Sequence, residues 1–317
     1  MPWITVAILS PVLSALGSYT DKYLLVHHRQ TGGLGSILIF SCFLGILVIP
    51  LALFFGGDPF SVSIAASIAM AINGGLTVAS LAAYLYAMEK RDIISVAPVL
   101  QTIPVFALVL GYMLLGEALH MYEIIGAAFV IGSAILLSVE IEEEVGWTFN
   151  ARSLLLALLS AFLFAFSGAV FKFFAEQEGY WTVQFWEYIG IALTGCALFM
   201  LVSSYRRGFV RVVRGHRVKV IALNVLTELL TVSADLIINY ATLLAPIALV
   251  YTVIAFQPAF LLLYAFIGFI LAPKLVRKLS PLRRHVLLKI VAVGVMIYGA
   301  VIIHNPAALA LLSSFFG

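Results

Sequence analysis

The sequence predicts an all-α integral membrane protein with ten transmembrane helices, arranged as two inverted five-helix repeats. Three observations support this fold class: an apolar composition, ten apolar runs of membrane-spanning length, and self-similarity between the two halves. Of the 317 residues, 63% are hydrophobic and 10% are charged, and the mean hydropathy is +1.12. Soluble domains carry roughly a quarter of their residues as charged side chains. The composition therefore excludes a soluble protein.

The apolar runs have the length that a membrane requires, since a helix crosses the hydrocarbon core with about 20 mostly apolar residues. The first run has no basic segment before it and no A-x-A motif after it, so we interpret it as a span and not as a signal peptide. Charged or turn residues separate the ten expected spans, which cover residues 3–20, 34–55, 64–88, 94–115, 121–139, 153–174, 181–203, 218–240, 246–271 and 287–305.

Self-similarity between the halves indicates an internal repeat. The segments "AYLYAMEKRDIISVAPVLQTIPVF" and "LIINYATLLAPIALVYTVIAFQPAF" align at an offset of 154, which matches Tyr86 with Tyr240 and Pro104 with Pro258. We therefore expect one five-helix repeat over residues 1–140, an acidic linker over 141–152, a second repeat over 153–305, and an apolar tail over 306–317. Because each unit has an odd number of spans, the second copy must insert upside down. Inverted repeats are typical of secondary transporters, whose substrate site lies between the halves.

The positive charges predict the orientation in the membrane. Seventeen of the 18 Lys and Arg residues fall in the odd-numbered loops or at their edges, and only Lys172 lies toward the other side. Cytoplasmic loops carry the excess of Lys and Arg, so both termini are expected outside. Short basic loops between spans are attracted to anionic lipid and do not indicate nucleic-acid binding.

The first half resembles an EamA-type domain of the drug/metabolite transporter superfamily. The resemblance is carried by the proline in the fourth span, the "LLGEAL" turn and the fifth span "IIGAAFVIGSAILL". It implies a ten-span inverted-repeat carrier that moves small metabolites across a bacterial or archaeal cytoplasmic membrane. The second half departs from the pattern, because "LAPKLVRKLSPLRR" replaces the "GE" turn. Family members are usually drawn with cytoplasmic termini, and the charges of this chain argue for the reverse.

Polar residues recur along the eighth predicted span at intervals of three or four, which places them along one stripe of a helix. The stripe consists of Asn224, Glu228, Thr231, Asp235 and Asn239. A carboxyl group in a low-dielectric medium prefers its neutral form, so Glu228 and Asp235 are candidates for proton handling or for binding a cationic group of a substrate. The alternative is structural: a protonated carboxyl group that hydrogen-bonds to a neighbouring helix.

Other candidate site residues lie in the third, fourth, seventh and ninth spans. In the seventh span, Glu187 could pair with Lys172 of the sixth span to form an outer gate, although neighbouring aromatic residues also suggest an interfacial anchor. Gln101 and Gln257 lie close to prolines, which break helices and often line cavities. The remaining candidates for substrate or proton binding are Gln184, Asn73, Thr77, Tyr84 and Tyr251.

No catalytic or cofactor motif occurs in the sequence. A G-x-x-x-x-G-K-[ST] motif is absent, so ATP is not expected to drive transport. No His/Cys cluster indicates a metal, and we expect no cofactor. The function predicted is alternating-access transport or exchange of a small polar or amphiphilic metabolite, with protons as the coupling ion. The alternatives are an intramembrane enzyme and a non-transporting membrane receptor or scaffold.

Overall fold

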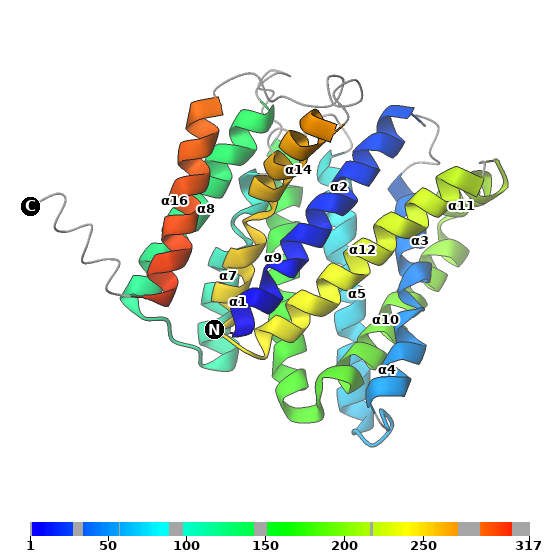
Figure 1. Ribbon diagram of the computed structural model, residues 1–317. Coiled ribbons are helices and arrows are strands. Elements are labelled where there is room, and N and C mark those ends of the chain that lie inside the picture. Colours follow the sequence, from blue (N-terminus) through cyan, green and yellow to red (C-terminus); the bar gives the residue numbers. More distant parts are fainter. Residues whose placement is uncertain are drawn as a thin grey trace, which may run out of the picture.

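The computed structural model describes residues 2–27, 34–56, 58–88, 98–142, 151–215, 218–271 and 286–305. Within these ranges the secondary structure is helical, and no strand occurs. The helices lie side by side in one bundle (Figure 1). Among the described residues, seven helical segments are long and apolar enough to cross a membrane, and three shorter apolar helices accompany them. The chain is therefore an integral membrane protein.

Apolar helices overlap the predicted spans along the described part of the chain. The first half contains α1 (Pro2–Ala7), α2 (Leu9–His27), α3 (Leu34–Gly45), α4 (Val48–Gly56), α5 (Ile64–Met88), α7 (Ile103–Leu110), the π-helix η1 (Gly111–Leu115) and α8 (Met121–Glu142). The second half contains α9 (Ala151–Glu178), α10 (Tyr180–Leu201), α11 (Ser203–Gly215), α12 (Val218–Thr242), α13 (Ile247–Ile254), α14 (Gln257–Leu271) and α16 (Val286–His304).

Four spans are interrupted, and each interruption has a proline a few residues beyond it. The regular helix breaks at Ile8 before Pro11, at 46–47 before Pro50, at 101–102 before Pro104 and at 255–256 before Pro258. Proline lacks the amide hydrogen that bonds to the carbonyl four residues earlier, and its ring clashes with that carbonyl. The breaks predicted beside Gln101 and Gln257 are therefore present.

Close helix packing depends on a few glycines. A Cβ atom on Gly74 of α5 would lie 2.0 Å from the carbonyl oxygen of Glu187 on α10, and one on Gly190 would lie 1.8 Å from that of Ala71. The helices α8 and α16 also meet at glycines, because a Cβ atom on either Gly126 or Gly299 would lie 2.7 Å from the other residue's oxygen. At these positions only glycine permits the observed distance between backbones.

Ala128 and Gly132 of the fifth span have the small-x-x-x-small spacing that often marks a helix contact. They do not form one here, since Ala128 is exposed and a Cβ atom on Gly132 would meet nothing within 4 Å. The glycine that contacts the partner helix is Gly126, about one and a half turns earlier.

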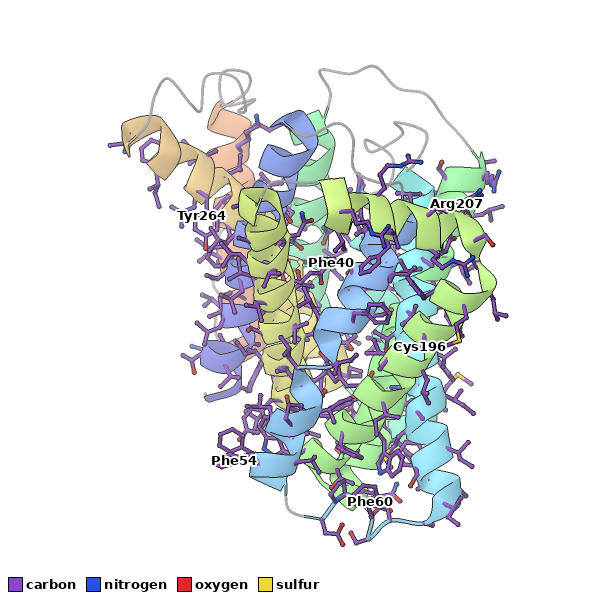
Figure 2. All side chains as sticks on the ribbon, turned by 90° about the vertical axis from the view of Figure 1, so that its right-hand side faces the viewer. Phe40, Phe54, Phe60, Cys196, Arg207 and Tyr264 are labelled. Carbon is purple, nitrogen blue, oxygen red and sulfur yellow. The ribbon has the colours of Figure 1, made fainter. Side chains whose placement is uncertain are left out.

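The basic segment after the seventh span, expected to be a loop, is the amphipathic helix α11. Its four arginines, at 206, 207, 211 and 214, are exposed, whereas Phe209 packs against Phe40 and Phe43 of α3 and Phe199 of α10. Phe209 therefore packs against neighbouring helices while the arginines stay exposed, and Figure 2 shows Arg207 and Phe40 at this end of the molecule. The first turns of α9 and α16, which contain Arg152 and Lys289, lie at the same end of the molecule (Figure 1).

Candidate functional site

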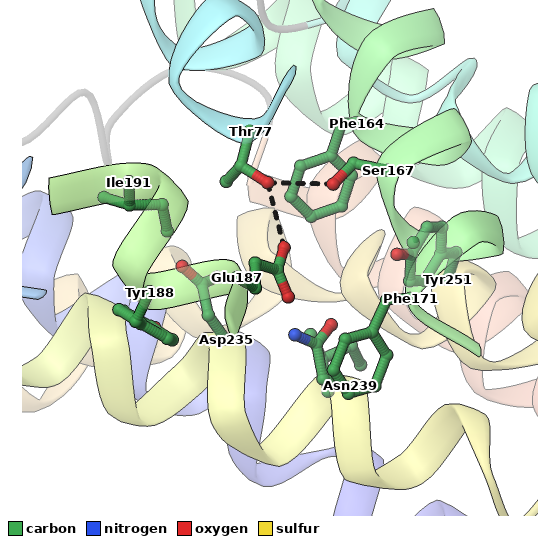
Figure 3. Close-up of a pocket in the computed structure, with 12 residues that line it drawn as sticks. Thr77, Phe164, Ser167, Phe171, Glu187, Tyr188, Ile191, Asp235, Asn239 and Tyr251 are labelled. Carbon is green, nitrogen blue, oxygen red and sulfur yellow. Dashed lines mark hydrogen bonds between the residues drawn. The ribbon is translucent and has the colours of Figure 1, made fainter. Parts of the chain in front are cut away.

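A cavity of about 60 Å³ lies where α5, α9, α10, α12 and α13 meet (Figure 3). A water molecule needs roughly 10–15 Å³ of such space, so the cavity can hold a few waters or a small polar group. Its wall is formed by Thr77, Phe164, Ser167, Gly168, Phe171, Glu187, Tyr188, Ile191, Asp235, Ile238, Asn239 and Tyr251. Polar and aromatic side chains therefore line the same space.

Glu187 is the most completely buried acidic group of this wall, with 4% of the residue exposed. Its Oε1 atom accepts hydrogen bonds from the Asn73 amide at 3.2 Å and from the Thr77 hydroxyl at 3.1 Å. The Thr77 hydroxyl also lies 2.8 Å from that of Ser167. The second carboxyl oxygen of Glu187, Oε2, is buried and has no hydrogen-bond partner among the described residues. One oxygen of this carboxyl group is thus held by two side chains of α5, and the other is open to the cavity.

Asp235 of α12 lies in the same wall as Glu187 (Figure 3). In the described part of the chain, no hydrogen bond or ion pair satisfies its carboxyl group, which is partly buried. One helical turn later, Asn239 contributes an amide to the same space. The charged residues of the cavity wall are these two acids, so the wall carries no positive charge to neutralise them.

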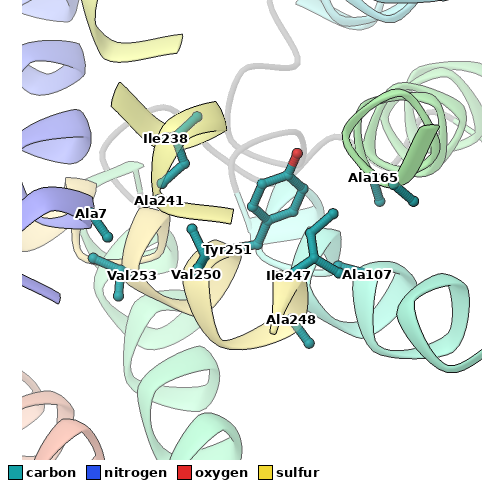
Figure 4. Close-up of a cluster of buried hydrophobic side chains, with 11 residues drawn as sticks. Ala7, Ala107, Ala165, Ile238, Ala241, Ile247, Ala248, Val250, Tyr251 and Val253 are labelled. Atoms are coloured by element: carbon teal, nitrogen blue, oxygen red, sulfur yellow. The ribbon is translucent and has the colours of Figure 1, made fainter. Parts of the chain in front are cut away.

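The aromatic part of the wall is positioned by tight packing around α13. Residues 247–253 are all buried, and Tyr251 is 1% exposed. Small residues surround it, including Ala107, Ala165 and Ala248 (Figure 4). A Cβ atom on Gly168 would lie 1.7 Å from the Tyr251 hydroxyl, so glycine at this position is what allows the phenol ring to reach the cavity.

The structure brings together some of the residues that the sequence singled out. Thr77, Glu187, Asp235 and Tyr251 line the cavity. Asn73 lies behind Glu187 and fixes its orientation through the hydrogen bond to Oε1.

The other candidates lie outside the wall of this cavity. Gln184 is fully buried, and its side-chain amide has no hydrogen-bond partner among the residues that the structure describes. Gln257 donates to the Ser18 hydroxyl at 3.2 Å. Thr231 is exposed and bonds back to the carbonyl of Thr227 in its own helix. Three further candidates are partly buried elsewhere in the bundle: Asn224, Tyr84 and Gln101.

The carboxyl group of Glu228 has different surroundings from that of Asp235. Its Oε1 atom accepts a hydrogen bond from the Ser41 hydroxyl of α3, and Glu228 does not line the cavity. The polar stripe of α12 therefore divides: Asp235 and Asn239 face the cavity, and Glu228 faces the second span. This contact fits the structural alternative, in which the carboxyl group joins two helices.

The predicted pair of Lys172 with Glu187 is wrong. The Lys172 ammonium lies 2.5 Å from Glu117 Oε1, 2.9 Å from the Ala245 carbonyl and 3.8 Å from the more exposed Glu176. Glu117 follows Gly116, whose φ of 68° forms the expected tight turn. The second oxygen of Glu117 accepts from the Ile247 amide at 2.9 Å. Glu117 therefore caps α13 of the second half and not the helix that follows it in sequence.

Several residues of the wall were not predicted, namely Phe164, Ser167, Gly168 and Phe171 of α9. The Ser-Gly pair inside an apolar helix was a usable signal, because small residues mark close contacts in membrane bundles. Phe164 and Phe171 carried none, since phenylalanine is as common on a lipid-facing surface as around a cavity.

Residues 1–139 match the sequence model of the EamA-like transporter family. The first half of the chain is therefore similar to an EamA domain, a family of the drug/metabolite transporter superfamily. Over its full length it is similar to a solved structure titled "Crystal structure of protein", with 14% identity and a TM-score of 0.58, covering 96% of this chain and 98% of that one. At this identity the likeness shows the fold alone. No curated protein matches the chain.

Proposed function

We propose that this protein is a secondary transporter that moves a small polar or amphiphilic metabolite by alternating access. The observation that carries the proposal is the convergence of polar side chains from four helices on one cavity inside an apolar bundle. Buried polar groups are costly in a membrane protein and usually mark a substrate or ion pathway. The EamA-like family of residues 1–139 supports a transporter rather than an enzyme.

The proposal assigns residues 1–140 and 153–305 to two inverted repeats. Two equivalent contacts between the halves support this assignment: α5 packs along α9, and α12 packs along α2. In the proposed repeat, each of these contacts joins the third span of one half to the first span of the other half. The reciprocal contact between Gly126 and Gly299 is what an axis relating the fifth and tenth spans would produce.

The proposed coupling ion is the proton, and the proposed proton site is Asp235 together with Glu187. Both carboxyl groups line the cavity, so a bound substrate and a bound proton would share one low-dielectric environment. Glu228 was a candidate for the same role, but its bond to Ser41 favours a contact between helices.

The proposed orientation places α11 on the cytoplasmic side and both termini outside. The exposed arginines of α11 support it, because basic residues next to spans favour the cytoplasmic face. The first residues of α1 and the last of α16 lie at the opposite end of the bundle (Figure 1).

Flux into liposomes tests the transport function. The purified protein should accelerate exchange of at least one compound from a panel of labelled small metabolites, and Asp235→Asn should abolish that exchange. Glu123→Gln is the matched control, since Glu123 lies outside the cavity and its amide analogue can still accept the bond from the His120 amide. Equal flux in the wild type, in Asp235→Asn and in Glu187→Gln would overturn the proposed site.

A further inference from the structure

From the cavity wall we infer that the transported metabolite is a small amine that carries a protonated primary ammonium group and no carboxylate. The inference rests on the proposed transport function and adds the chemical class of the substrate. It follows from the charge of the wall, from the hydrogen-bonding atoms left open in it, and from the rings that surround them.

The charge of the wall selects a cation. Glu187 and Asp235 are the charged residues that line the cavity, and both are acidic. Lys172, on the same helix as Phe171, is paired with Glu117 and does not line the cavity. A substrate carboxylate would meet two acidic groups at low dielectric without a positive partner, which is unfavourable. The wall therefore disfavours simple acids and zwitterionic amino acids.

The open hydrogen-bonding atoms select a cation that has N–H donors. Glu187 Oε1 already accepts two hydrogen bonds, from Asn73 and Thr77, whereas Oε2 is buried and accepts none. If Glu187 were simply a neutral structural group, the proton on Oε2 would need an acceptor, and the described residues supply none. A buried polar atom without a partner is costly. A primary ammonium group brings three N–H donors, enough for Glu187 Oε2 and for the carboxylate of Asp235.

The aromatic residues suit the remainder of such a molecule. Phe164, Phe171, Tyr188 and Tyr251 line the same cavity as the two acids (Figure 3). Aromatic faces attract cations and also pack against short alkyl chains. The cavity volume of about 60 Å³ restricts the group held in this conformation to a small one.

Binding of matched probes to the protein in nanodiscs tests the inference. The probes are n-butylammonium, the neutral butan-1-ol and the anionic butyrate, which share a four-carbon skeleton and differ in the charge of the polar end. We expect n-butylammonium to raise the melting temperature with increasing concentration, as a ligand of the folded state does. Butan-1-ol and butyrate should give no saturable shift. Tetramethylammonium should bind at least about 10-fold more weakly, because it has charge but no N–H donor.

Variants assign the binding to the cavity. Glu187→Gln and Asp235→Asn should each weaken n-butylammonium binding about 10-fold or more, because each removes one of two charges that face the ligand. Glu123→Gln should leave the affinity unchanged. Should the two cavity variants fail to fold, the ranking of the four probes on the wild type still decides the question.

The outcomes separate this inference from the proposed function. Saturable binding of butyrate but not of n-butylammonium, or flux of an anionic metabolite blocked by Asp235→Asn, would overturn the amine assignment and leave the transport function standing. Absence of flux for every class of metabolite would overturn both. Flux and binding of n-butylammonium, each lost in the two cavity variants, would support both.

Discussion

The ion pair of Lys172 with Glu117 gives a prediction whose size follows from the structure. The two side chains are 6% and 15% exposed, and Glu117 also caps α13 through the Ile247 amide. Lys172→Met keeps the apolar stem and removes the charge, which leaves a largely buried carboxylate with only its cap bond. Removal of one partner of a buried pair costs about 3–5 kcal/mol, and the partial exposure of Glu117 places the expected loss at about 3 kcal/mol.

The assay is equilibrium unfolding in mixed micelles, followed by circular dichroism. Glu117→Gln keeps an acceptor for the Ile247 amide. The loss of unfolding free energy in the double variant with Lys172→Met should therefore be smaller, by about 1–3 kcal/mol, than the sum of the losses in the two single variants. Glu176→Gln is the control: this carboxylate lies 3.8 Å from Lys172 but is 54% exposed. Its removal should cost less than about 1 kcal/mol. Equal losses for Lys172→Met and Glu176→Gln would refute the reasoning.

Three further predictions concern packing, the cavity and orientation. Gly168→Ala should displace the Tyr251 ring and weaken substrate binding, since the new Cβ atom would lie 1.7 Å from the phenol oxygen; binding assays measure this effect. Gly126→Ala should destabilise the protein by about 1–3 kcal/mol in thermal unfolding, whereas Gly132→Ala, with nothing within 4 Å, should not. An alkaline phosphatase fusion at the C-terminus should be active, and one after Arg214 should be inactive; the opposite pattern would reverse the proposed orientation.

The spans could be predicted because their signal is local. Runs of about 20 apolar residues between charges are sufficient to locate membrane helices, and the helix interruptions follow from Pro11, Pro50, Pro104 and Pro258. The helix α11 was missed for a related reason. Its arginines were used only to infer orientation, although their spacing also fits one face of a helix that packs Phe209 against α3.

The site could be predicted only in part, because partners between helices depend on contacts far apart in sequence. Periodicity placed Glu228 and Asp235 on one stripe of a helix. Only the packing of α12 shows that Glu228 accepts a hydrogen bond from Ser41 and that Asp235 lines the cavity. We expected Lys172 to pair with Glu187, yet its main partner, Glu117, lies 55 residues away. The partner of each charged side chain therefore depends on tertiary structure and not on the local sequence pattern.

The central claim is that the carboxyl groups of the cavity, and not Glu228, couple protons to substrate movement. The direct measurement is flux of a transported metabolite into liposomes under an imposed pH gradient, compared for Asp235→Asn, Glu187→Gln and Glu228→Gln. The account predicts that the first two variants lose flux driven by the pH gradient, because the substitutions remove titratable groups of the cavity. Glu228→Gln should keep it, since its amide oxygen can still accept from Ser41. Gradient-driven flux that persists in Asp235→Asn and Glu187→Gln, but disappears in Glu228→Gln, would contradict the claim.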